Sequence, residues 1–150
     1  MSILGACSDA AQPTSPSSPT SRSSSRPSVT PVTKTAFMAR ANALCTKSNK
    51  KLENAARTAF GSQRPTTQTW RPFMVDVVLP IVEHRLHDLG ELPAPTGDQA
   101  AVTSITNTGR AAVDTATHNP HILSPLSRAP FDHFDELAIA YGIPGCAVGG

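Results

Sequence analysis

Three cysteines are the residues of this chain whose placement points most directly to chemistry. Cys7 ends the segment Leu4-Gly5-Ala6-Cys7, a pattern typical of the site at which bacterial lipoproteins are lipidated. Cys45 and Cys146 lie near opposite ends of the segment that can fold. Thiols of exported domains are normally paired, so we expect a disulfide between Cys45 and Cys146. The alternative is two buried free cysteines in a cytoplasmic protein, and there is no Cys-x-x-Cys motif for redox chemistry.

The residues around Cys7 bear on export. A secretory signal carries an apolar stretch of roughly 7–15 residues before its cleavage site, and only Met1-Ser2-Ile3 precede the cysteine segment. We therefore expect either a longer leader upstream of Met1 or a chance match. Residues 8–33 are dominated by Ser, Thr and Pro, which bury too little apolar surface to offset the entropy of ordering. We expect residues 1–33 to form a disordered linker between a lipidated Cys7 and a folded domain over residues 34–150.

The histidines are the candidate ligands for a metal ion or a haem group. His84 and His87 are three residues apart on one expected helix, and His118 and His121 flank the end of another. Such spacing can place two imidazoles beside one metal ion. It is also typical of a solvated polar helix face, which we favour because there is no His-Glu-x-x-His motif. We expect no cofactor, and we keep a small helical metal- or haem-binding protein as the alternative.

The sequence lacks the common patterns of catalytic sites. No serine lies in a Gly-x-Ser-x-Gly elbow, and no glycine-rich phosphate loop is present. Asp132, Asp135 and Glu136 cluster at the start of an expected helix, where carboxylates interact favourably with the helix dipole. We interpret this cluster as structural, rather than as a calcium site or an acid–base pair. We therefore expect no enzymatic activity, with a catalytic accessory in a complex as a weaker possibility.

Charge is unevenly distributed along the chain. Residues 34–71 hold eight Lys or Arg and one Glu, whereas residues 72–150 hold three Arg and nine Asp or Glu. This asymmetry can let a basic helix lie against acidic neighbours, or it can present a basic face to anionic lipid or cell-wall polymer. We expect no nucleic-acid partner, because this helix lacks exposed aromatic residues for stacking. The expected basic face comprises Lys47, Lys50, Lys51 and Arg57.

Helical periodicity predicts the first two elements that position these residues. A first helix is expected over residues 34–60, ended by Gly61. Its inward stripe should comprise Phe37, Ala41, Leu44, Ser48, Leu52, Ala55 and Ala59, with Cys45 at its border. A second helix is expected over residues 69–89, with a kink or junction at Pro80, because proline removes a backbone hydrogen bond and clashes with the preceding turn. Its spine should comprise Val75, Leu79, Val82, Leu86 and Leu89.

Two further helices complete the expected fold. Asp98 is a plausible cap for the third helix, which ends before Asn119-Pro120 and has small inward residues that allow close helix approach. Pro130 suits the first turn of the fourth helix, and Gly142 suits its C-cap. The third stripe comprises Val102, Ile105, Gly109, Ala112 and Ala116, and the fourth comprises Phe131, Phe134, Ala138 and Tyr141. Short connections predict an all-α fold, a single small antiparallel four-helix bundle after a disordered N-terminal stalk.

Several short motifs are spread over almost the whole of residues 34–146. They are Phe37 with Ala41-Asn42-Ala43-Leu44-Cys45, the pair Leu79-Pro80, the spacing Leu86-x-x-Leu89-x-x-Leu92-Pro93-x-Pro95-x-Gly97-Asp98, and Pro130-Phe131 with Ala138-x-x-Tyr141-Gly142-Ile143-x-x-Cys146. In these motifs the chain resembles a family of small exported actinobacterial lipoproteins to which no activity is assigned. The resemblance implies a helical fold and an envelope compartment, and it implies no active site.

These patterns together predict a non-enzymatic lipoprotein of the cell envelope that binds or spaces something at the cell surface. No stretch approaches the roughly 18 continuous apolar residues of a transmembrane helix. We therefore expect membrane attachment only through a lipid anchor. The expected location is the extracytoplasmic face of the envelope, with secretion as the other outcome.

Overall fold

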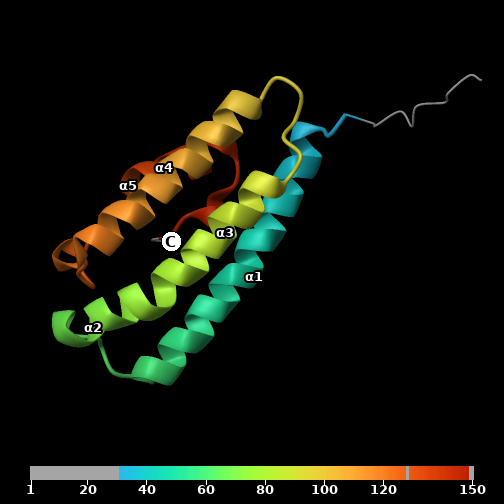
Figure 1. Ribbon diagram of the computed structural model, residues 1–150. Coiled ribbons are helices and arrows are strands. Elements are labelled where there is room, and N and C mark those ends of the chain that lie inside the picture. Colours follow the sequence, from blue (N-terminus) through green and yellow to red (C-terminus); the bar gives the residue numbers. More distant parts are fainter. Residues whose placement is uncertain (1–30, 128, 149–150) are drawn as a thin grey trace, which may run out of the picture.

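The structure is a computed structural model that describes residues 31–127 and 129–148 (Figure 1). This part of the chain is all-α, with helices and no strand. Cys7 and residues 8–30 of the expected stalk lie outside the described residues. Among the helices that the structure describes, none is both long and apolar enough to span a bilayer.

Helix α1 (Lys34–Phe60) has the bounds expected from the sequence. Thr33 caps its start, with Oγ1 accepting a hydrogen bond from the backbone N–H of Ala36 at 3.2 Å. Gly61 ends the helix with φ of 58°, a value that favours glycine. The expectation that Ala59 faces inward is wrong: Ala59 is exposed, and Phe60 is half-buried at the helix end instead. The fully buried positions of α1 are Phe37, Ala41, Cys45 and Ser48.

The expected second helix is longer than residues 69–89 and is divided. It consists of α2 (Thr67–Phe73), a π-helical turn η1 (Met74–Val78) and α3 (Leu79–Glu91). The junction expected at Pro80 is confirmed, because η1 ends two residues before it. The π turn adds backbone between Pro80 and the preceding turn, where the proline ring would otherwise clash with a carbonyl group. Leu79, Val82, Leu86 and Leu89 are buried on α3, as expected from their spacing.

Helix α4 (Gln99–His118) buries every residue of its expected stripe. Gly109 lies where α4 packs against Leu86 of α3 and Phe134 of the last helix. A Cβ atom at this position would come within 2.5 Å of Leu86 Cδ2 and 2.9 Å of Phe134 Cδ2. Asp98 occupies the N-cap position, but its side chain makes no capping hydrogen bond. Its Oδ2 instead accepts a hydrogen bond from the hydroxyl of Tyr141 at 2.8 Å.

The last helix begins later than expected. Helix α5 (Asp132–Tyr141) starts two residues after Pro130, with Phe131 at its N-cap position, so Pro130 is not in the first turn. Gly142 ends α5 in the left-handed region with φ of 102°, as its C-cap role predicts. Two short 3-10 turns flank α4 and α5, namely η2 (Pro120–Ile122) and η3 (Pro144–Cys146).

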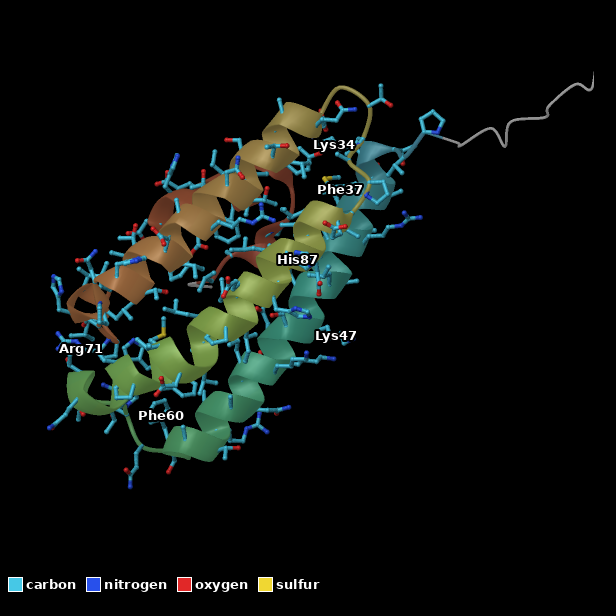
Figure 2. All side chains as sticks on the ribbon, in the orientation of Figure 1. Lys34, Phe37, Lys47, Phe60, Arg71 and His87 are labelled. Carbon is cyan, nitrogen blue, oxygen red and sulfur yellow. A yellow bond between two sulfur atoms is a disulfide. The ribbon has the colours of Figure 1, made fainter. Side chains whose placement is uncertain are left out.

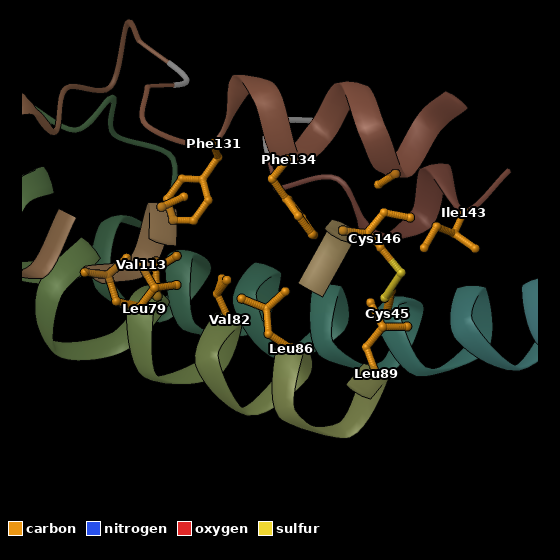
Figure 3. Close-up of a cluster of buried hydrophobic side chains, with 14 of the residues drawn as sticks. Cys45, Leu79, Val82, Leu86, Leu89, Val113, Phe131, Phe134, Ile143 and Cys146 are labelled. Atoms are coloured by element: carbon orange, nitrogen blue, oxygen red, sulfur yellow. A yellow bond between two sulfur atoms is a disulfide. The ribbon is translucent and has the colours of Figure 1, made fainter. Parts of the chain in front are cut away.

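Helix α3 lies between α1 and α4, and α5 packs behind α4 (Figure 1). The turn η3 returns to α1, where the sulfur atoms of Cys45 and Cys146 are joined at 2.00 Å and their Cα atoms are 4.9 Å apart. The expected disulfide is therefore confirmed. Figure 3 shows it beside the core formed by Val82, Leu86 and Phe134. The cross-link thus fastens the C-terminal segment to the middle of the core.

Candidate functional site

The basic face expected on α1 is exposed. Lys47, Lys50, Lys51 and Arg57 are all solvent-accessible, and none forms an ion pair with a described residue. Figure 2 shows Lys47 projecting away from α1. These side chains are available to an external anion, because no internal carboxylate of the described chain neutralises them.

A groove between α1 and α3 divides this basic set. The groove has a volume of about 590 Å³, and Lys47 and Lys51 line its α1 side. Lys50 and Arg57 do not line it. We call it the α1–α3 groove; its apolar lining comprises Ala43, Leu44, Pro80 and Ile81, and its polar lining comprises Lys47, Ser48, Lys51, His84, Arg85 and Asp88. The groove therefore combines an apolar surface with three cationic side chains and one carboxylate.

That carboxylate is already engaged. Asp88 Oδ2 lies 3.4 Å from Nε2 of His84 one turn earlier on α3, and the pair is ionic when His84 is protonated. His87 is exposed and lies outside the groove lining. The two exposed lysines of the lining, Lys47 and Lys51, outnumber this one carboxylate, so the groove presents more positive than negative charge.

The structure does not bring the four candidate metal-binding histidines together as a site. His118 lies on the last turn of α4, where Nδ1 is 3.2 Å from Asp114 Oδ1, and His121 is exposed in η2. Within residues 31–127 and 129–148, no group of three or more His, Cys, Asp or Glu side chains is placed to hold a metal ion. The exposure expected for His84 and His87 is confirmed.

The principal polar feature missed at the sequence level is Arg85, whose side chain is only 1% exposed. Its guanidinium donates three hydrogen bonds: Nε to Ser48 Oγ at 3.0 Å, Nη2 to Asn49 Oδ1 at 2.8 Å and Nη1 to the carbonyl of Cys146 at 3.1 Å. Burial lowers the pKa of Arg85 to about 10, although the charge of Asp135 acts in the opposite direction. Arg85 therefore links α1, α3 and the C-terminal segment beneath the α1–α3 groove.

Amide side chains of α1 hold the same C-terminal segment. Asn42 donates to the carbonyl of Gly142 at 3.3 Å and accepts from the N–H of Gly145 at 3.0 Å, while Asn49 donates to the carbonyl of Gly145 at 2.9 Å. Asp135 accepts from the N–H of Val148 at 2.6 Å. Asp135 is thus a buried structural acceptor rather than a surface charge that only complements the helix dipole.

The burial of Arg85 has a signal in the sequence, because Arg85 shares the inward face of α3 with Val82 and Leu89. Nothing local in the sequence identifies its hydrogen-bond partners.

Comparison with known proteins assigns neither a family nor a function to this chain, so the functional argument depends on the geometry of its surface. No family model matches the chain, and no curated protein or solved structure matches it significantly. Cys7, the expected lipidation site, lies outside the described residues. Of the four basic residues expected to bind an anionic surface, Lys47 and Lys51 lie together in the α1–α3 groove, beside its apolar lining.

Proposed function

We propose that this protein is a non-enzymatic binding module of the cell envelope, anchored through a lipid on Cys7, which holds anionic lipid against the basic face of α1. The proposal includes membership of the small exported lipoprotein family that the sequence resembles. It also includes an antiparallel four-helix bundle as the framework, supported by the short connections from α1 to α2 and from α3 to α4.

The observation that carries the proposal is the composition of the α1–α3 groove. Lys47 and Lys51 lie one turn apart on one side, and Leu44 and Ile81 contribute apolar surface beside them. A lipid presents a charged head group together with an apolar chain, whereas a cell-wall polymer presents charge without an apolar chain. Each Lys or Arg near an anionic bilayer contributes about 1 kcal/mol of attraction. The groove therefore favours anionic lipid over polymer.

Two further features support the non-enzymatic and extracytoplasmic parts of the proposal. The buried ionisable groups Arg85 and Asp135 are engaged with structural partners rather than directed at a reacting atom. The Cys45–Cys146 disulfide suits an oxidising compartment, because cytosolic thiols are normally kept reduced.

The test compares two pairs of charge reversals on the same helix. In the full chain carrying Cys7→Ser, which removes the anchor, Lys47→Glu with Lys51→Glu should weaken binding to phosphatidylglycerol vesicles at least about tenfold. Lys50→Glu with Arg57→Glu changes the net charge equally outside the groove and should weaken binding less. Co-sedimentation measures both, and phosphatidylcholine vesicles provide the uncharged reference.

Three outcomes separate the possibilities. Equal losses with both pairs would assign binding to the whole basic face rather than to the groove. Retention by isolated anionic cell-wall polymer, but not by vesicles, would assign the partner to the polymer. Unchanged vesicle binding in both pairs, with helical circular dichroism preserved, would contradict the proposed function.

A further inference from the structure

A second cavity lies apart from the α1–α3 groove and shares no lining residue with it. We call it the α1–α2 cavity. It has a volume of about 480 Å³ and is bounded by the C-terminal half of α1, by α2 and η1, and by residues 123–127, 129 and 131 of the loop that precedes α5. This volume falls within the range of about 300–1,000 Å³ typical of small-molecule sites.

The lining of the α1–α2 cavity is predominantly apolar. Phe73, Met74 and Phe131 are buried and contribute to its wall, whereas Trp70 and Leu52 are half-buried. Trp70 is also held in an aromatic cluster, with its ring centroid 5.7 Å from that of Phe73 and 6.1 Å from that of Phe60. Packing on two aromatic neighbours restrains the Trp70 ring, so one wall of the cavity is arranged before a ligand arrives.

The lining also includes a leucine that the fold leaves exposed. Leu126 is 96% exposed although it lines the cavity. Its loop is anchored by buried residues on either side, Leu123 at 2% and Phe131 at 3% exposure. Within the loop, Ser124 accepts hydrogen bonds at 3.2 Å from the N–H of Leu126 at its Oγ and from the N–H of Ser127 at its carbonyl oxygen. An anchored turn therefore holds an apolar side chain in water, and a ligand that covers it would gain hydrophobic free energy.

Charge indicates which ligand would enter. Of the described residues that line the cavity, Glu53 alone is charged, and no described cation lines it. An anionic head group would meet this carboxylate, in contrast to the α1–α3 groove with its lysines. We propose that the α1–α2 cavity binds an uncharged, largely apolar small molecule in contact with Trp70 and Leu126. This site is independent of the proposed lipid-binding face.

The test uses the full chain with its disulfide intact and the uncharged fluorophore N-phenyl-1-naphthylamine. Trp70 is the single tryptophan of the chain, so energy transfer from it to the probe reports binding near the cavity. Leu126→Ser should weaken binding roughly three- to tenfold, because part of the apolar contact of a leucine is lost. Ile139→Ser is the matched control: Ile139 is 57% exposed on α5 and lines none of the cavities described above, so binding should not change.

Two further measurements make the result decisive. Ala56→Phe adds an aromatic ring to the lining of the cavity and should abolish the energy transfer. If this variant does not fold, Leu126→Ser alone decides. Octanol should displace the probe several-fold more effectively than octanoate, and Glu53→Gln should narrow that difference. Unchanged affinity in Leu126→Ser, equal losses in Leu126→Ser and Ile139→Ser, or octanoate competing as well as octanol would each overturn the proposal.

Discussion

At the scale of single residues, burial determines whether a cationic side chain of this protein bonds to internal acceptors or remains exposed to solvent. Arg85 and Lys47 lie on neighbouring helices, yet Arg85 is enclosed and Lys47 is exposed. The planar guanidinium of Arg85 directs several donors at fixed acceptors, which a lysine at the same place would not reproduce. In the described residues no buried side-chain nitrogen or oxygen lacks a hydrogen-bond partner. A buried cation is tolerated here because each of the three guanidinium nitrogens donates to an acceptor.

Tyr141 allows a direct test at the same scale. Burial, together with the hydrogen bond to Asp98 and its negative charge, raises the pKa of Tyr141 from 10.0 to about 12. Because it is the one tyrosine in the chain, phenolate absorbance during an alkaline titration should report this side chain alone, with a midpoint near 12 in the folded protein. Asp98→Asn should lower the midpoint, although burial should keep it above the ordinary value.

The same shift has a consequence for stability. The folded state retains the phenol proton at pH values where the unfolded state loses it, so the stabilising contribution of Tyr141 is complete below about pH 10 and is lost as the pH rises towards 12. Tyr141→Phe should remove this part of the alkaline decline in the free energy of unfolding. A tyrosine midpoint near 10 in the folded wild type would contradict the assignment.

At the scale of elements, the contact between α3 and α4 depends on one glycine. Gly109 brings α4 against Leu86 of α3 and Phe134 of α5, both of which are completely buried. Neither neighbour can move into solvent, since the surrounding core is close-packed. The small inward residue expected from the sequence therefore sets how closely three helices pack.

The start of α3 has a separate cause. The π turn ends at Val78, directly before the first residue of α3, and Pro80 follows.

A pair of glycine substitutions tests this account. Gly109→Ala should lower the free energy of unfolding by about 1–3 kcal/mol, because overpacking outweighs the gain in helix propensity. Gly90→Ala on α3 is the matched control: its Cβ would lie 3.2 Å from Nη2 of Arg110, the end of a flexible exposed side chain. That change should stabilise by about 0.5–1 kcal/mol. Denaturant unfolding measures both, and stabilisation by Gly109→Ala would refute the close packing.

At the scale of the whole molecule, the C-terminal segment closes the fold by covalent and polar contacts. The disulfide joins residues 101 positions apart in the chain, and Asn42, Asn49 and Arg85 bind the same segment through its backbone. The cross-link restricts the unfolded chain, whereas the hydrogen bonds specify where the segment packs. The two kinds of contact should therefore be separable by experiment.

Removing the disulfide should destabilise the protein without displacing the C-terminal segment. Cys45→Ala with Cys146→Ala should lower the free energy of unfolding by about 4–5 kcal/mol in the chain-entropy model. Helical circular dichroism should be retained under native conditions, and chemically reduced wild type should show a similar loss. Identical stability of the oxidised and reduced proteins would mean that the cross-link contributes nothing to the fold.

The amino-acid sequence by itself determined the helical segments and most of their inward faces. Helix α1 has the expected bounds, and the buried residues of α4 match the expected stripe because apolar spacing at the helical period is a local property. Pro80 likewise marks a junction through its own ring and missing N–H. The cysteine pair was predictable from composition and placement, since exported thiols tend to pair.

Only the tertiary structure decided which residues meet across the helices. Arg85 is a buried link rather than a surface charge because Ser48, Asn49 and the Cys146 carbonyl converge on it from distant positions. The division of the basic residues into groove-lining and outlying pairs depends in the same way on where α3 packs against α1. The exposed Leu126 lines an aromatic cavity because its loop packs near α1 and α2. Local periodicity specifies the face that a helix buries, but the partners on that face follow from non-local packing.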